Sequence, residues 1–393
     1  MEILVQKMYE VDRNNLTVVL CKVWPNINKH LDRVYTYYAG PASGIWDLFE
    51  ELPNSTFIKS INDQIANGKD IIFLYNISEI MREPTIDKIH NCLPNLNIDP
   101  SKIYFVTGAL DGPENYEKYC QSKGYTDRIT ILAANLFLNV SKEQNSWDVY
   151  SEYIPKLRTK KFLCFNRVER KHRMVLVHKL LTNDLVDTAY YSFYGNNFNS
   201  RWIDKISITA NNKYDIKMLE LREDLKRYKH LFPMHLTADV KVRNNPISVN
   251  TSDIELFDNS YYSIVTETYF YTDPAADHLS SGIIPAMFFT EKIYKPISMK
   301  HPFILVSRAN SLKWLRKFGF KTFSPYINES YDDETDDDTR MNMIVDEVKR
   351  LNQFTDSEWM DWQNNIKAIV DYNFQIYSNL KDYSFNPNQD LDF

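Results

Sequence analysis

The sequence predicts an α/β protein of two lobes, each built around a parallel β-sheet. The chain has 393 residues, more than the roughly 250–300 residues at which a single core stops growing. Apolar runs of about five or six residues recur between helix-length segments, as expected for parallel strands buried on both faces. This alternation restarts after residues 151–160. We therefore expect one lobe at residues 1–157 and a second at residues 158–393.

Four short apolar runs predict the strands of the first lobe. They lie at residues 16–23 (LTVVLCKV), 70–75 (DIIFLY), 102–107 (KIYFVT) and 129–133 (ITILA). A helical stretch is expected around residues 78–82. Gly108 follows the third run, at the strand end where parallel sheets bind ligands. It is either a plain turn residue or a point where the backbone comes close to a ligand.

The second lobe repeats the pattern. Strands are expected at residues 161–165, 189–193, 262–266 and 302–306, and helices at residues 170–182, 291–299, 310–318 and from 355 toward 380. Thr290 is the expected N-cap of the helix at 291–299, in which Pro296 requires a kink or a short helix. Gly319 should cap the C-terminus of the helix expected at residues 310–318. Thr355 and Glu358 have the spacing of a capping box that opens the long terminal helix.

Composition and charge narrow the class of protein. Hydrophobic residues make up 44% of the chain and the formal net charge is −6, which argues mildly against a protein that binds nucleic acid by general electrostatics. The four cysteines form no C-x-x-C pair and fit a reducing compartment. The N-terminus lacks the apolar core of a signal peptide, and no run approaches about 18 apolar residues. We expect a cytoplasmic protein with no membrane partner.

An acidic run occupies residues 332–338 (DDETDDD). It is expected to be a solvated loop. A metal site is the weaker alternative, because the run lacks the glycine and the glutamate spacing of a calcium-binding loop.

A cationic motif follows the first strand of the second lobe and opens a helix. It reads NRVERKHR at residues 166–173 and includes Arg167, Arg170, Lys171, His172 and Arg173. The N-terminus of a helix favours anions, so cations there are unfavourable unless an anion binds among them. The motif is therefore either a diphosphate site or a solvated surface turn, and the residues alone do not decide between the two.

A second motif, TEKIYKPI, places Glu291 and Lys292 in the first turn of the next helix, with Tyr294 one turn in. A carboxylate can bind ribose hydroxyls and an ammonium can bind phosphate. The alternative is that Glu291 only complements the helix dipole. Upstream, Glu267 ends the strand at 262–266, where it is either a ligand-binding residue or a hydrogen-bond partner of the next loop.

The order of these motifs resembles the C-terminal half of the α1,3-fucosyltransferase family. That family has a strand ending in a Glu-Asn-Ser-like triplet, then TEK, a helix and a Pro-containing apolar strand. The chain also resembles uncharacterised bacteriophage and giant-virus glycosyltransferase-like proteins, through residues 166–173, 290–297, and 319–323 with 329–332. The resemblance covers about residues 160–332. Thr268 departs from it, because it replaces the asparagine of the triplet.

The resemblance implies a glycosyltransferase fold of the B type, with two Rossmann-like lobes and a cleft between them. It implies that Glu291 binds the donor ribose, that Lys292 binds the diphosphate, and that Arg173, or else Arg167 or Arg170, neutralises the leaving group. Glu267 would lie near the donor. The expected donor-binding residues are Glu291, Lys292, Arg173, Arg167, Arg170, Glu267, Asn166 and Tyr294.

The expected reaction transfers a sugar from a nucleotide-sugar to a hydroxyl group, with inversion at the sugar. No Asp-x-Asp ends a strand, so we expect no cofactor and no obligatory metal; Arg, Lys and backbone donors would stabilise the leaving group. Inversion needs a base, for which the candidates are Asp111, Glu114 and Asp47. His172 is a weaker candidate, because it lies among cations.

The alternative functions differ in the molecule that accepts the sugar. It is either a glycan, a protein or a small molecule, or a hydroxymethylated base in duplex DNA. The DNA alternative needs a cationic surface, for which the segment 217–241 offers Arg222, Lys226, Arg227, Lys229 and Lys241 with Tyr228, His230 and Phe232 between them. Its acidic residues equally fit an amphipathic helix with a solvated face. A further alternative is a non-catalytic virion or scaffold protein.

Overall fold

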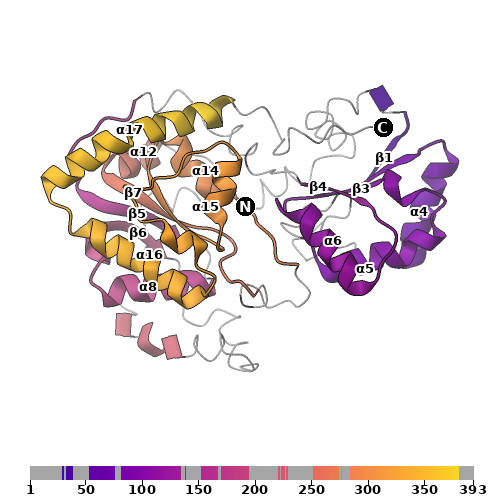
Figure 1. Cartoon of the computed structure of the whole chain (residues 1–393), viewed down its shortest axis with the longest axis horizontal. Coiled ribbons are helices and arrows are strands. Elements are labelled where there is room, and N and C mark those ends of the chain that lie inside the picture. The colour runs from indigo at the N-terminus through magenta and orange to yellow at the C-terminus, as the bar shows by residue number, and fades with distance from the viewer. Residues whose placement is uncertain are drawn as a thin grey trace. The chain divides into compact units, whose positions relative to one another are not determined.

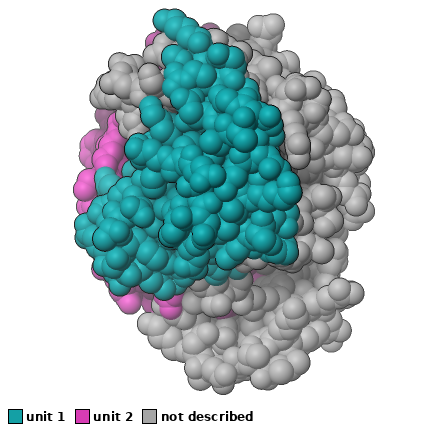
Figure 2. All heavy atoms as spheres, turned by 90° about the vertical axis from the view of Figure 1, so that its right-hand side faces the viewer, with its two compact units in different colours: residues 1–139, 280–288, 381–393 teal, residues 140–279, 289–380 magenta. Residues whose placement is uncertain are grey.

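The chain forms two compact units, each with its own parallel sheet. The computed structural model describes residues 29–30, 32–38, 53–75, 81–133, 138, 152–166, 170–193, 220–221, 223–225, 227–228, 251–273, 276 and 284–379. Unit 1 comprises residues 1–139, 280–288 and 381–393, and unit 2 comprises residues 140–279 and 289–380 (Figure 2). Each unit has a four-stranded sheet whose paired strands are all parallel. The predicted mixed α/β class is therefore confirmed.

The sheet of unit 1 has the order β1-β2-β3-β4. Its strands are β1 (Val34–Tyr38), β2 (Ile71–Tyr75), β3 (Ile103–Thr107) and β4 (Thr130–Ala133). Its helices are α4 (Asn54–Ala66), α5 (Glu83–Cys92) and α6 (Gly112–Lys123), with short 3₁₀ turns η2 (Leu93–Asn95) and η3 (Pro100–Lys102) (Figure 1). The strands predicted at residues 70–75, 102–107 and 129–133 are confirmed to within one residue. The strand expected at 16–23 lies outside the described residues.

The core of unit 1 lies between the sheet and its helices. Apolar side chains of β2 and β3, such as Leu74 and Phe105, pack with Phe57 of α4 and with Ile86 and Ile89 of α5. All of them are at most 1% exposed. Burying an aliphatic or aromatic side chain of this size contributes about 1.5–3 kcal/mol. Ile71, Phe73 and Val106, which alternate with these residues along the strands, are buried as well, so these apolar runs form strands buried on both faces.

Only the last two residues of the helix expected around residues 78–82 are described, since residues 78–80 lie outside the described residues. In the described part of that stretch, Arg82 is extended (φ −120°, ψ 140°) and is the N-cap of α5, which begins at Glu83. Pro84 lies in the first turn, where its missing N–H is not needed for a helical hydrogen bond. Residues 81 and 82 therefore precede a helix rather than end one, and the proline marks where that helix starts.

A segment distant in sequence completes unit 1. The backbone N–H of Ile284 donates to the carbonyl of Met81 (3.1 Å), and that of Leu110 donates to the carbonyl of Met287 (2.8 Å). Ile284 is buried in the same core as α4 and α5. Unit 1 is therefore not one continuous stretch, whereas the division expected from the sequence places a single boundary after residue 157.

The sheet of unit 2 has the order β6-β5-β7-β8. Its strands are β5 (Lys160–Asn166), β6 (Ala189–Phe193), β7 (Ser260–Thr266) and β8 (Phe303–Val306). Its helices are α8 (Lys171–Thr182), α12 (Thr251–Asp258), α14 (Glu291–Ser298), α15 (Ser311–Lys317), α16 (Asp337–Asn352) and α17 (Asp356–Asn379), with η5 (Val186–Thr188) and η8 (Ser330–Asp333). Helices α8 and α16 lie on one side of the sheet, and α12 and α17 lie on the other (Figure 1). All four strands predicted here are confirmed.

The predicted helix ends are also confirmed. The hydroxyl of Thr290 accepts a hydrogen bond from Lys292 N and caps α14, which ends at Ser298. Thr355 and Glu358 form a reciprocal capping box at the start of α17. Gly319, which follows α15, has a φ of 87°, a conformation that costs glycine little and other residues more.

The acidic run at residues 332–338 is only in part the solvated loop that the sequence predicts: Asp333, Thr335, Asp336 and Asp338 are exposed, but two of its aspartates are buried. Asp332 is 4% exposed, and its carboxylate accepts the backbone N–H groups of Leu312 (2.9 Å) and Lys313 (3.1 Å) at the start of α15. Asp337 is also buried and lies 2.6 Å from Arg340. For these two residues the prediction was wrong, because a helix N-terminus and a buried guanidinium supply the donors that let their carboxylates leave water.

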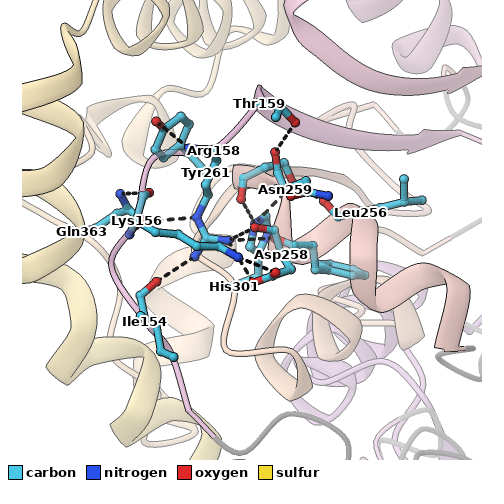
Figure 3. A network of polar contacts seen from close by, with 12 residues as sticks. Ile154, Lys156, Arg158, Thr159, Leu256, Asp258, Asn259, Tyr261, His301 and Gln363 are labelled. Carbon is cyan, nitrogen blue, oxygen red and sulfur yellow. Dashed lines mark hydrogen bonds and ion pairs between the residues drawn. The ribbon is translucent and has the colours of Figure 1, made fainter.

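Arg158 ties the segment before β5 to the rest of unit 2 (Figure 3). Its side chain is fully buried. The guanidinium donates to Gln363 of α17 (3.0 Å), to the carbonyl of Phe257 (3.3 Å) and to the carbonyl of Asp258. Its own backbone N–H donates to the hydroxyl of Tyr261 (3.0 Å). Through its side chain and its backbone N–H together, this one residue joins α12, β7 and α17 at the amino-terminal edge of the sheet.

His301 lies near the same edge and is held in its neutral form. It is 2% exposed; Nε2 lies 2.8 Å from the carbonyl of Ser260, and Nδ1 lies 2.8 Å from the hydroxyl of Ser263. The carbonyl can only accept, so Nε2 carries the proton and Nδ1 accepts from the serine. Burial lowers the pKa of His301 to about 3, with the Ser260 carbonyl opposing this shift.

We expect His301 to weaken the fold as the pH falls. Because its pKa is lower in the folded chain than in the unfolded one (about 6.5), the unfolded chain binds one more proton between these values. Its contribution is complete above about pH 6.5 and declines toward pH 3, by about 1.4 kcal/mol per pH unit. Urea unfolding between pH 4 and 6 should therefore show a shallower pH dependence for His301→Gln than for the wild type. Equal slopes would contradict the assignment.

Candidate functional site

The candidate site lies at the carboxyl-terminal edge of the sheet in unit 2. Helix α8 begins just after β5, and the start of α14 is hydrogen-bonded to the residue that follows β7. The ends of the two strands are joined, since the hydroxyl of Thr266 donates to Asn166 Oδ1 (2.7 Å). The structure thus brings together the three motifs singled out in the sequence, at the edge where parallel sheets bind ligands.

Glu267 occupies the centre of this edge and is fully buried. Its carboxylate accepts the backbone N–H of Thr290 (3.1 Å), the hydroxyl of Thr290 (2.7 Å) and the backbone N–H of Thr268 (3.2 Å). Burial raises the pKa of Glu267, and the charge of Lys292 opposes this rise. Because Glu267 is fully buried and bonded to the backbone around it, it lies beneath the site and does not face a bound nucleotide-sugar directly.

The start of α8 contributes two cations, Arg170 and Arg173, and the imidazole of His172, all of which contact the end of β7 or the loop that follows it. His172 Nε2 lies 3.0 Å from the carbonyl of Glu267, and Arg173 donates to the carbonyls of Thr266 (3.1 Å) and Glu267 (3.3 Å). Arg170 donates to the carbonyl of Thr268 (3.2 Å). Both His172 and Arg173 are buried. The loop after β7 is thereby fixed to the start of α8.

These cations raise the local electrostatic potential. Burial, together with the charges of Arg173 and Arg170, holds the pKa of His172 well below its usual range. Burial and repulsion from Arg170 lower the pKa of Arg173 to about 10, so it remains protonated at neutral pH. A neutral, buried His172 that packs against Phe270 (5.7 Å between ring centroids) has a structural role, which agrees with its low rank as a base.

Glu291 and Lys292 form the part of the site that reaches solvent. Their side chains are 18% and 28% exposed and form an ion pair of 3.0 Å. Lys292 Nζ also donates to the hydroxyl of Thr290 (2.9 Å). Burial would raise the pKa of Glu291, but the charge and hydrogen bond of Lys292 outweigh it, so the pKa is lowered. Both side chains are charged and oriented at the start of α14.

Three cations, Arg170, Arg173 and Lys292, thus surround two carboxylates, Glu267 and Glu291. This leaves an excess of positive charge at the starts of two helices, whose dipoles add to it. Such an arrangement can bind an anion with two charged groups, and the partial burial strengthens each interaction relative to water.

Two of the expected donor-binding residues lie away from the exposed part of the site. Asn166 is fully buried and is engaged with Thr266 and with Cys164 (3.1 Å). Tyr294 is also fully buried, and its ring stacks on Tyr377 of α17 (6.0 Å between centroids). Tyr294 therefore contributes to the core between α14 and α17. Arg167 lies outside the described residues.

The candidate bases belong to unit 1. Asp111 follows β3, and its carboxylate accepts the backbone N–H of Met287 (2.7 Å). Glu114 is exposed in the first turn of α6. Both lie near the carboxyl-terminal end of β3, as expected from their place in the sequence. Asp47 lies outside the described residues.

The segment proposed for DNA contact is described only in part. Arg222, Lys226, Lys229, His230, Phe232 and Lys241 lie outside the described residues. In the described part of the segment, Asp224 pairs with Arg227 (3.4 Å) and with His178 of α8 (3.3 Å). The described part of the segment thus includes an acidic residue that offsets the positive charge of Arg227.

No cluster of three or more His, Cys, Asp or Glu side chains is arranged to hold a metal ion in the part of the chain that the structure describes. None of the described helices is long and apolar enough to cross a membrane.

From the sequence, Thr290 is expected only to cap a helix. In the structure its hydroxyl also joins Glu267 to the Lys292 ammonium. The signal available in the sequence was the threonine two residues before a lysine at a helix start, since such a hydroxyl can reach both the backbone and the side chain of that lysine.

Comparison of the chain with protein-family models, with curated proteins and with solved structures finds no match. The assignment of a function therefore depends on the residues of this chain.

Proposed function

We propose that the chain is a glycosyltransferase that takes a sugar from a nucleoside diphosphate sugar and transfers it to a hydroxyl group, with inversion. The proposed architecture is the two-lobed Rossmann-like arrangement of the B type, with the donor bound by unit 2. One observation carries the proposal: Glu291 and Lys292 lie side by side, partly exposed, at a strand edge that also gathers Arg170 and Arg173.

The arrangement suits the chemistry of glycosyl transfer. As the sugar leaves, negative charge develops on the diphosphate, and fixed cations and helix N-termini stabilise that charge most where water is partly excluded. Lys292 would contact a phosphate directly, and Arg173 would add its charge from beneath. Glu291, which is ionised, would accept hydrogen bonds from ribose hydroxyls.

A panel of nucleotides and nucleotide-sugars with uracil, guanine and cytosine bases tests the proposal. We expect the nucleotides of one nucleobase to raise the melting temperature of the protein. The nucleotide-sugar with the same nucleobase should be hydrolysed slowly when no acceptor is present. The measurements are differential scanning fluorimetry and release of nucleoside diphosphate. If no member of the panel stabilises the protein or is hydrolysed, the proposal is wrong.

Turnover is expected to need no divalent metal, because cationic side chains would neutralise the leaving group. Release of nucleoside diphosphate should therefore continue at a similar rate in EDTA. Loss of turnover in EDTA, followed by recovery on adding Mg²⁺ or Mn²⁺, would show instead that a metal ion takes part.

A further inference from the structure

The hydroxyl of Thr290 has three partners, which together fix its orientation. Its oxygen lies 2.7 Å from Glu267 Oε2, 3.3 Å from the backbone N of Lys292 and 2.9 Å from Lys292 Nζ. A hydroxyl has one proton and two lone pairs, and both nitrogens of Lys292 can only donate. The hydroxyl must therefore accept from both nitrogens and give its own proton to Glu267.

Glu267 is itself held from several sides. Its backbone N–H donates to the carbonyl of Val306 in β8 (3.0 Å), and its carboxylate accepts two backbone N–H groups, from Thr268 and Thr290. Its carbonyl accepts from His172 and Arg173 of α8. The position of the carboxylate is thus set by the sheet, and both helix starts are aligned on one residue.

We infer that Glu267 is a positioning residue, which acts through the hydroxyl of Thr290 to hold the Lys292 ammonium at the mouth of the site. The further claim, that this ammonium binds a diphosphate, rests on the proposed function. A free lysine side chain has many rotamers, and fixing it in advance removes most of the entropy cost of ordering it when an anion binds.

Glu267→Gln separates this role from simple packing, because the two side chains have nearly the same shape. The carboxylate accepts from both the N–H and the O–H of Thr290, whereas an amide has only one accepting oxygen. If that oxygen keeps the Thr290 N–H, the amide nitrogen faces the hydroxyl and donates to it. The hydroxyl proton must then point toward Lys292, whose nitrogens also carry protons, so the ammonium keeps Glu291 as a partner but loses the Thr290 hydroxyl as an acceptor.

The test measures how fast Lys292 is acetylated by a small amine-reactive reagent in the ligand-free protein, by peptide mass spectrometry. We expect Glu267→Gln to raise the rate at Lys292 about fivefold, the factor that corresponds to one net hydrogen bond. Thr290→Val should have a similar effect and Thr290→Ser little effect. The double variant should react no faster than Thr290→Val alone, because both changes break the same link.

Exposed Lys313 on α15 is the internal reference, and its rate should not change. The inference is overturned if Glu267→Gln leaves Lys292 unchanged, if the two substitutions add, or if Lys313 accelerates equally, since that would indicate general loosening. If Glu267→Gln does not fold, the comparison of Thr290→Val with Thr290→Ser still decides whether the hydroxyl holds Lys292, and equal rates in these two overturn the inference.

The same variants distinguish this inference from the proposed function. Melting temperatures are measured with the same panel of uracil, guanine and cytosine nucleotides. If none of them stabilises the wild type, the donor assignment fails while the acetylation rates still decide the positioning role. If the wild type is stabilised and Glu267→Gln is not, with Lys292 acetylated faster, both are supported.

Discussion

Lys292→Ala is expected to remove most of the stabilisation that a nucleoside diphosphate gives the wild type. A ligand at 100 times its dissociation constant stabilises a protein by about 2.7 kcal/mol, or roughly 5–10 °C for a unit of this size. A hydrogen bond to a charged group contributes about 1.5–3 kcal/mol, so the shift should fall to less than half at the same ligand concentration. Differential scanning fluorimetry with the nucleotide selected from the panel measures it.

The ligand-free variant should melt close to the wild type, because Lys292 is 28% exposed and its ion pair with Glu291 is partly solvated. Lys313→Ala is the matched control. It removes an exposed lysine from the neighbouring helix α15, and it should keep the full shift. A Lys292→Ala protein that keeps the full shift would show that the donor does not bind at this helix start.

Arg158→Met is expected to destabilise the protein by about 3 kcal/mol or more. The variant keeps an apolar stem but removes the donors that serve Gln363 and the carbonyls of Phe257 and Asp258. Buried acceptors that lose their donors cost about 1–3 kcal/mol each. The change in the free energy of unfolding should be visible in urea titrations followed by tryptophan fluorescence.

Lys156→Met provides the control for charge. Its ammonium pairs with the same Asp258 as Arg158, but its side chain is 40% exposed, whereas that of Arg158 is fully buried. A solvated pair of this kind contributes about 1 kcal/mol or less. Equal losses in the two variants would indicate that Arg158 acts only as a charge near Asp258, and the network in Figure 3 would not be the source of stability.

The strands of both sheets could be predicted because their signal is local. A run such as residues 161–165 is apolar on both faces, and β5 extends it by only one residue at each end. The acidic run at residues 332–338 could not be read in this way. Asp332 is buried because it meets the start of α15 about twenty residues earlier in the chain, and a short window of sequence does not contain that partner.

The site could be predicted in outline for a similar reason. Strand ends and helix starts are visible in the sequence, and the parallel topology brings them to one edge. The roles of single residues depended on distant partners: Asn166 meets Thr266 across 100 positions, and Glu267 meets Thr290 across 23. Tyr294 was within reach of the sequence, because Ile293, Tyr294 and Ile297 share one face of a short helix and are all buried.

The return of residues 280–288 to unit 1 has a consequence for synthesis. A ribosome completes residues 1–139 first, but Ile284 and Met287, which bond to Met81 and Leu110, emerge about 150 residues later. At about 5–20 residues per second, this delay is on the order of 10–30 seconds. During that interval the nascent unit 1 lacks part of its core, and we expect it to be a client for chaperones until the missing segment arrives.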